Sequence, residues 1–209
     1  MSGRRVGGRR VSDEAKRAAK AKLRDAVKKL RARLAPEDAA AAARAVRELV
    51  LAELRIPERA VVSGFWPIGD EFDPRPLMEA LAARGHRLCL PVVVGKGRPL
   101  AFRAWKPGDP LESAGFGLSV PAWDAAPAIP GFLIVPLLAF DRRGFRLGYG
   151  AGYYDRTIEA LRASGKRVFA LGVGFAAQEV PEVPVLAHDQ RLDAIATEAY
   201  LIETGQRGG

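Results

Sequence analysis

Residues 144–155 read G-F-R-L-G-Y-G-A-G-Y-Y-D and join an apolar run to a segment with helical periodicity. The apolar run, residues 132–140, predicts a buried strand, and residues 153–162 predict a helix. A glycine-rich turn between strand and helix suits phosphate, because its N–H groups converge on an anion near the positive end of the helix. The glycine spacing matches neither the Walker loop nor the dinucleotide-binding fingerprint. The stretch therefore predicts a phosphate site, with a purely structural turn as the alternative.

The side chains around this turn favour a nucleotide over a structural role. Arg146 supplies a planar, permanently charged guanidinium that matches phosphate oxygens. Tyr149, Tyr153 and Tyr154 offer aromatic faces, and Asp155 offers a carboxylate at the helix start. Stacking, phosphate binding and metal binding would each find a partner among these residues.

The net charge of +9 is not spread over the chain. Residues 1–33 hold thirteen Lys or Arg against three acids, a balance of +10, which leaves twenty basic and twenty-one acidic residues, or −1, in the remainder. We therefore expect a solvated basic arm and helix and no nucleic-acid partner; a polyanion bound by the arm is the alternative. Residues 1–11 are expected to be disordered, and residues 12–205 to form one α/β domain that includes an N-terminal helical pair.

Other features of the composition indicate where the protein works. No apolar run reaches the roughly 18 to 20 residues that a membrane helix needs, so we expect no membrane partner. The first residues lack the apolar centre of a secretory signal. They are basic, as in a mitochondrial transit peptide, but show no amphipathic pattern. The single cysteine, Cys89, excludes an intramolecular disulfide and fits a reducing cytoplasm. We expect a monomer.

Helical and strand patterns alternate along most of the chain. Ser12 caps a helix that should run to about residue 34, and Pro36 starts a second helix that should run to about residue 54. Further helices are expected at residues 75–84 and 153–162, and strands at residues 60–66, 87–94, 100–105, 132–140, 167–173 and 194–202. Residues 106–130 read as a loop. The order predicts a three-layer, Rossmann-like α/β sandwich, with a mainly parallel sheet, helices on both faces and ligands at the carboxyl ends of the strands.

A few polar and aromatic residues outside the glycine stretch are candidates for chemistry. Asp193 can join Asp155 as a magnesium ligand, since magnesium needs one or two carboxylates beside substrate phosphates. From spacing alone, turn or capping roles are favoured for Asp189 and Asp193. Glu71 can bind an amino-substituted heterocycle or can simply solvate its loop. An aromatic wall for a flat ligand is possible, with core packing as the alternative, at Phe65, Trp66, Phe102 and Trp105.

Four stretches, taken in order, resemble the 5-formyltetrahydrofolate cyclo-ligase family. They are K-A-K-L-R at 20–24, W-P-I-G-D-E-F at 66–72, P-L-L-A-F-D-R-R-G-F-R-L-G-Y-G-A-G-Y-Y-D-R at 136–156 and L-D-A-I-A-T-E at 192–198. The third is highly specific. The resemblance implies ATP-dependent closure of 5-formyltetrahydrofolate to 5,10-methenyltetrahydrofolate through phosphorylation of the formyl oxygen, with Mg²⁺ as cofactor. A family member that binds nucleotide or folate without turnover is the alternative.

The resemblance also implies roles for individual residues. It assigns ATP binding to Lys20, Arg24, Arg146, Leu147, Gly148, Tyr149, Gly150, Ala151, Gly152, Tyr153 and Tyr154. It assigns folate binding to Trp66, Glu71 and Tyr154, catalysis to Lys20, Arg146 and Tyr154, and magnesium to Asp155 and Asp193. One position departs from the family, because Ala151 stands where some members carry lysine. Phosphate neutralisation should therefore depend more on Lys20, Arg24, Arg146 and the metal.

Overall fold

The computed structural model describes residues 12–115 and 117–205, so the arm predicted at residues 1–11 lies outside the described residues. Seven strands form one sheet in the order β11–β10–β9–β6–β1–β2–β3. Their bounds are β1 Val61–Ser63, β2 Arg87–Val92, β3 Ala101–Ala104, β6 Phe132–Pro136, β9 Phe169–Val173, β10 Ala194–Ala196 and β11 Leu201–Glu203. The five inner strands are parallel, and β3 and β11 run antiparallel at the two edges. The predicted α/β fold with a mainly parallel sheet is confirmed.

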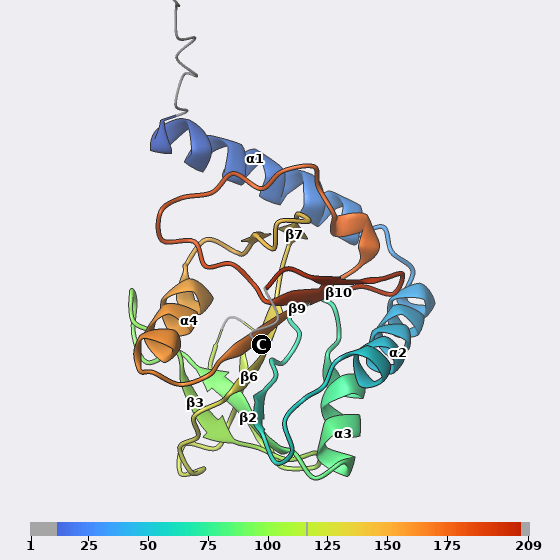
Figure 1. The fold of residues 1–209 in the computed structure, drawn as a ribbon, viewed down its shortest axis with the longest axis vertical. Helices are drawn as coiled ribbons and strands as arrows, with labels where there is room; N and C mark the ends of the chain where they lie inside the picture. The colour runs from blue at the N-terminus through green and yellow to red at the C-terminus, as the bar shows by residue number, and fades with distance from the viewer. Residues whose placement is uncertain (1–11, 116, 206–209) are drawn as a thin grey trace, which may run out of the picture.

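Helices cover both faces of this sheet (Figure 1). The α-helices are α1 Asp13–Arg31, α2 Pro36–Glu53, α3 Arg75–Ala83 and α4 Tyr153–Ala163, and a short 3-10 helix spans Ala176–Gln178. Side chains alternate along β6: Phe132 and Ile134 pack with α2 and α3, whereas Leu133 and Val135 pack with α4. Helix α1 lies across the end of the sheet, where Val27 packs into a small apolar cluster of its own.

The first two helices begin where the sequence predicts. The Ser12 hydroxyl accepts a hydrogen bond from the Ala15 amide at 3.2 Å, and Pro36 occupies the first turn of α2. Helix α1 ends at Arg31, short of the predicted residue 34, because the chain tightens there into a turn in which the Leu34 amide donates to the Arg31 carbonyl. Among the described residues, no helix is both long and apolar enough to cross a bilayer.

Three predicted segments are divided differently in the structure. The run 132–140 ends as β6 at Pro136, and the chain then forms an antiparallel hairpin of β7 (Ala139–Phe140) and β8 (Arg146–Leu147) before α4. The strand predicted at 194–202 is two antiparallel strands, β10 and β11. The predicted loop 106–130 contains a hairpin of β4 (Leu111–Ser113) and β5 (Ser119–Pro121). An apolar pattern marks burial but does not show where a buried segment turns.

A buried carboxylate anchors the β7–β8 turn to a distant segment. Asp141 is fully buried, and its Oδ1 accepts hydrogen bonds from the backbone amides of Arg143 and Phe145 at 3.0 and 3.3 Å. Its Oδ2 accepts from the Val183 amide at 2.9 Å and from the Arg143 guanidinium at 2.7 Å. Asp141 therefore holds the turn before the glycine stretch against the chain that leads to residues 186–190.

Replacing Asp141 by asparagine should lower the free energy of unfolding by roughly 2–3 kcal/mol. The asparagine would place an N–H₂ group where one carboxylate oxygen of Asp141 now accepts hydrogen bonds, so hydrogen-bond donors would face one another. The measurement is the urea midpoint, with the slope checked for two-state behaviour. Glu182→Gln is the matched control, since Glu182 pairs with the same Arg143 at the surface and should cost less than about 1 kcal/mol. Equal midpoints for the two variants would contradict the anchoring role of Asp141.

Candidate active site

A cavity of about 910 Å³ opens at the carboxyl ends of β1, β2 and β6. Its walls come from α1, the loop after β1, the end of β2, the β4–β5 hairpin, the glycine stretch and residues 186–189. The β4–β5 hairpin brings part of the region predicted as a loop to the site, through Ala114, Leu118, Ser119 and Val120. The cavity therefore lies where a parallel sheet of this kind binds its ligands.

The glycine stretch forms one wall with a backbone that is bare toward the cavity. Gly150 and Gly152 have φ angles of 107° and 66°, in the region that favours glycine. Gly152 is the N-cap of α4 and gives that helix no side-chain cap. Two loop carbonyls are bound by arginines from outside the turn, Gly148 by Arg24 Nε at 2.9 Å and Ala151 by Arg156 Nη2 at 2.6 Å. Bare glycine backbone and an uncapped helix start are what an anionic ligand needs.

Of the predicted nucleotide residues in the glycine stretch, one side chain lies elsewhere. Arg146 and residues 148–154 line the cavity. Leu147 is almost fully buried and packs with Val27 beneath α1. Its side chain therefore faces the core and does not line the cavity. Leu147 lies in strand β8, where successive side chains point to opposite sides, which places Arg146 toward the cavity and Leu147 toward the core.

Helix α1 contributes a row of cations to the opposite wall. Arg17, Lys20 and Arg24 are spaced by three and four residues, so they share one face of the helix and all line the cavity. Lys20 is buried, and its ammonium is ion-paired with Asp189. Arg17 was not among the predicted site residues, although its helical spacing from Lys20 is a signal that could have found it.

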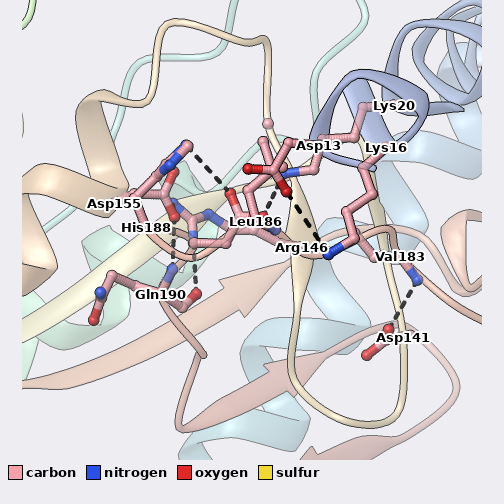
Figure 2. Close-up of polar contacts among 12 residues, drawn as sticks. Asp13, Lys16, Lys20, Asp141, Arg146, Asp155, Val183, Leu186, His188 and Gln190 are labelled. Atoms are coloured by element: carbon pink, nitrogen blue, oxygen red, sulfur yellow. Dashed lines mark hydrogen bonds and ion pairs between the residues drawn. The ribbon is translucent and has the colours of Figure 1, made fainter. Parts of the chain in front are cut away.

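Arg146 is held in place by acceptors on two sides. Its side chain is only 3% exposed; Nη2 lies 3.2 Å from Asp155 Oδ1, and Nη1 donates to the Gln190 carbonyl at 3.1 Å. The Gln190 amide donates to the same Asp155 oxygen at 3.0 Å, so the Gln190 backbone bridges Arg146 and Asp155 (Figure 2). Arg146 Nε is buried without a hydrogen-bond partner among the described residues. The guanidinium is therefore fixed, with a donor still to be satisfied.

Residues 186–190 are a second part of the site that sequence reasoning missed. Asp189 pairs with Lys20 and also accepts from the Leu186 amide at 2.7 Å, while Gln190 binds both Arg146 and Asp155 through its backbone. Spacing alone favours a turn or capping role for Asp189, and its hydrogen bond to the Leu186 amide fits that role, but the ion pair with Lys20 goes beyond it. The polar run H-D-Q-R was a visible signal, but its partners lie in α1 and the glycine stretch, far away along the chain.

The other side of the cavity holds the predicted folate residues. Trp66 and Glu71 line it, and Trp66 packs edge-on against Trp105 with ring centroids 5.7 Å apart. Phe65 also lines it, whereas Phe102 and Trp105 are buried core residues outside the lining, so only half of the predicted aromatic wall faces the cavity. Glu71 Oε2 accepts from the Ile68 amide at 2.9 Å.

Tyr154 presents an unsatisfied hydroxyl at this side of the cavity. The hydroxyl is buried and has no hydrogen-bond partner among the described residues. Burial raises its pKa above the usual value of a tyrosine, and the negative charge of Glu71 raises it further. The group is therefore a protonated donor, ready to bind an acceptor on a ligand.

The two aspartates predicted to hold magnesium do not meet. Asp155 lines the cavity at the start of α4, but Asp193 lies at the amino end of β9, where its Oδ2 pairs with Arg162 at 2.8 Å and accepts from the Ala170 amide at 2.8 Å. Arg162 is in the last turn of α4, so the helix separates the two carboxylates. The described residues contain no cluster of three or more ligands for a metal. The structure therefore leaves Asp155 as the carboxylate of this pair that faces the cavity.

The chain is similar to one known protein family over most of its length. Residues 16–198 match the model of the 5-formyltetrahydrofolate cyclo-ligase family. The 5-formyltetrahydrofolate cyclo-ligase of Mycolicibacterium smegmatis is 34% identical over 70% of this chain and 77% of its own, and that of Escherichia coli K12 is 32% identical over 68% and 80%.

Solved structures agree with this assignment. The NMR structure of Aquifex aeolicus 5,10-methenyltetrahydrofolate synthetase superposes with a TM-score of 0.74 at 27% identity, over 91% of this chain and 94% of that one. A 5,10-methenyltetrahydrofolate synthetase from Mycoplasma pneumoniae, 19% identical over 86% and 98%, shares the fold with a TM-score of 0.68. The glycine stretch and the cations of α1 lie around one cavity, and the sequence matches extend over most of the chain. The chain belongs to the 5-formyltetrahydrofolate cyclo-ligase family.

Proposed function

We propose that this cavity catalyses the ATP-dependent closure of 5-formyltetrahydrofolate to 5,10-methenyltetrahydrofolate, with release of ADP and phosphate. Cyclo-ligase activity is what membership of the family assigns to the chain. The observation that carries the proposal is that one cavity joins the bare glycine backbone and the cations of α1 to Trp66, Glu71 and Tyr154. A phosphate tail and a flat polar heterocycle would then lie side by side.

The nucleotide half is built from fixed positive charge. Lys20, Arg24 and Arg146 surround the glycine stretch, and Arg17 extends the row on α1. Arg24 is bound through Nε to the Gly148 carbonyl, which leaves its other guanidinium nitrogens for phosphate oxygens. These side chains supply phosphate contacts in place of the lysine that some members of the family carry where this chain has Ala151.

The folate half is built from a carboxylate, a phenol and an aromatic face. Glu71 can accept paired hydrogen bonds from the amino and ring N–H groups of the pterin. Trp66 offers its ring to the flat heterocycle, and the Tyr154 hydroxyl, which has no partner among the described residues, donates to an oxygen of the folate. Each group is placed by the fold before the ligand arrives, so little ordering is needed on binding.

The reaction follows from placing the two ligands in contact. The formyl oxygen attacks the terminal phosphorus of ATP, the bond to the bridging oxygen breaks and ADP leaves. The neighbouring secondary amine of the folate then attacks the formyl carbon, the carbon–oxygen bond breaks, inorganic phosphate departs and the amine loses its proton to water. Lys20 and Arg146 balance the charge on the transferred phosphoryl group, and Tyr154 holds the folate in line. Catalysis is then mainly positioning and charge stabilisation.

Magnesium fits the donor set on the nucleotide side. The described contacts of Asp155 all use Oδ1, so Oδ2 is left to contact a cation at the cavity wall. Magnesium commonly takes one or two carboxylates and completes its shell with substrate phosphates and water, which Asp155 and ATP would provide. The bound ion would neutralise phosphate charge during transfer.

We place this activity in the cytoplasm, because the single cysteine fits a reducing compartment, and we expect the enzyme to act as a monomer. Cys89 is fully buried, and burial raises the pKa of its thiol to about 12, so it is an unreactive core residue.

The direct test is a spectrophotometric assay for 5,10-methenyltetrahydrofolate with purified protein, 5-formyltetrahydrofolate and Mg-ATP. Product should form only when ATP and magnesium are both present, with one ADP released for each product molecule. Binding of both ligands without product formation would instead favour the non-catalytic alternative.

Replacing Arg146 by alanine should slow turnover by about 10²-fold or more, because it removes a preorganised charge from the phosphoryl group. Arg142→Ala is the matched control, since Arg142 lies four residues earlier and pairs with Glu179 at the surface. Steady-state rates of both variants, taken with their melting temperatures, separate catalysis from folding. A turnover equal to wild type in Arg146→Ala would refute the role given to Arg146.

Replacing Asp155 by asparagine should raise the magnesium concentration needed for half-maximal activity without unfolding the protein, although the lost ion pair with Arg146 should lower the melting temperature. The same titration on Asp193→Asn decides whether the second aspartate takes part. We expect Asp193→Asn to lose stability without a shift in magnesium dependence, because its carboxylate is occupied by Arg162 and the Ala170 amide. A parallel shift in both variants would restore the two-aspartate site.

A further inference from the structure

Arg31 is a buried cation that the proposed reaction does not use. It is the last residue of α1 and is only 4% exposed. Its Nη2 donates to Asp70 Oδ1 at 2.6 Å, its Nη1 donates to the Tyr149 hydroxyl at 3.0 Å, and its Nε is buried without a partner among the described residues. A buried charge is costly unless its partners are well placed, so these two acceptors determine where Arg31 lies.

The two acceptors belong to opposite halves of the active site. Tyr149 is in the glycine stretch on the nucleotide side, and Asp70 is next to Glu71 in the loop on the folate side. Tyr149 and Glu71 also line both the main cavity and an adjoining cavity of about 500 Å³, which Arg31 lines as well. Arg31 therefore lies where the two halves meet.

Glu71 lies along the same cavity as Tyr149, which Arg31 binds. Burial raises the pKa of the Tyr149 hydroxyl, and the neighbouring Glu71 carboxylate raises it further, while Arg31 acts in the opposite direction. The phenol thus stays protonated, and it accepts a hydrogen bond from Arg31 with the Glu71 side chain nearby. Glu71 is held from its other side by the Ile68 amide. A displacement of Arg31 would therefore shift the Glu71 carboxylate, which we assign to pterin binding.

Helix α1 also contacts the glycine stretch about two turns earlier, where Arg24 binds the Gly148 carbonyl. The helix therefore binds consecutive residues of the glycine stretch through Arg24 and Arg31, and binds the folate-side loop through Arg31 and Asp70. Nucleotide that orders the glycine stretch would restrict Arg31, and Arg31 would restrict the loop that carries Glu71.

We propose that Arg31 is a positioning residue that couples nucleotide binding to folate binding across the active site. The proposal rests on the function proposed above, because it needs both ligands in the same cavity. Coupling of this kind is reciprocal, so each ligand raises the affinity for the other by the same factor. A guanidinium is suited to the role, because its fork reaches two acceptors at once.

The test is the dissociation constant of a non-hydrolysable ATP analogue, measured calorimetrically with and without saturating 5-formyltetrahydrofolate. The two constants should differ by about fivefold or more in the wild type. Arg31→Met should bring their ratio close to unity. A merely structural role would lower the folded fraction and the melting temperature but would leave the ratio of the folded protein unchanged.

Two further variants keep the test decisive. Tyr149→Phe leaves the pair of Arg31 and Asp70 intact and should also lower the ratio, even if Arg31→Met does not fold. Lys29→Met removes one exposed charge from the same helix and should keep the wild-type ratio.

The outcomes separate this inference from the proposed function. If the wild type forms no methenyltetrahydrofolate, the proposed function fails. If it is active but shows a ratio of unity, or if the variants at Arg31 and Tyr149 keep the wild-type ratio, the coupling role of Arg31 is overturned and the activity stands.

Discussion

Cations that are buried beside the glycine stretch must be held by acceptors, and this requirement organises the active site. The side chains of Lys20 and Arg146 are 8% and 3% exposed, so neither charge is solvated well by water. Each is paired with a carboxylate, Lys20 with Asp189 and Arg146 with Asp155, which offsets the cost of burial. The pairs also fix where the positive charge lies before any nucleotide arrives.

The same pairs connect segments that are far apart in the sequence. Residues 186–190 bind α1 through Asp189 and bind the glycine stretch through the backbone of Gln190. Asp141 ties the chain leading to this segment to the turn of the β7–β8 hairpin. A site built this way keeps its donors oriented at little reorganisation cost, which is what stabilisation of a transferred phosphoryl group requires.

Asp155 and Asp193 have different contacts because they lie near opposite ends of helix α4. Asp155 is in the first turn, beside the cavity, and Asp193 lies near the last turn with Arg162. By residue type and sequence context, both aspartates are predicted to bind magnesium. A helix of this length runs from the carboxyl ends of the strands to their amino ends, so position along α4 separates the two carboxylates.

The sequence by itself determined the alternation of strands and helices, the starts of α1 and α2, the bare glycine wall and the row of Lys20 and Arg24. These depend on periodicity and turn chemistry within a few residues. Only the tertiary structure decided that Leu147 faces the core, that the run after Pro136 turns back as a hairpin and that Asp189 is the partner of Lys20. Lys20 and Asp189 are 169 residues apart. Their pairing arises because α1 packs across the end of the sheet, and no local sequence pattern specifies it.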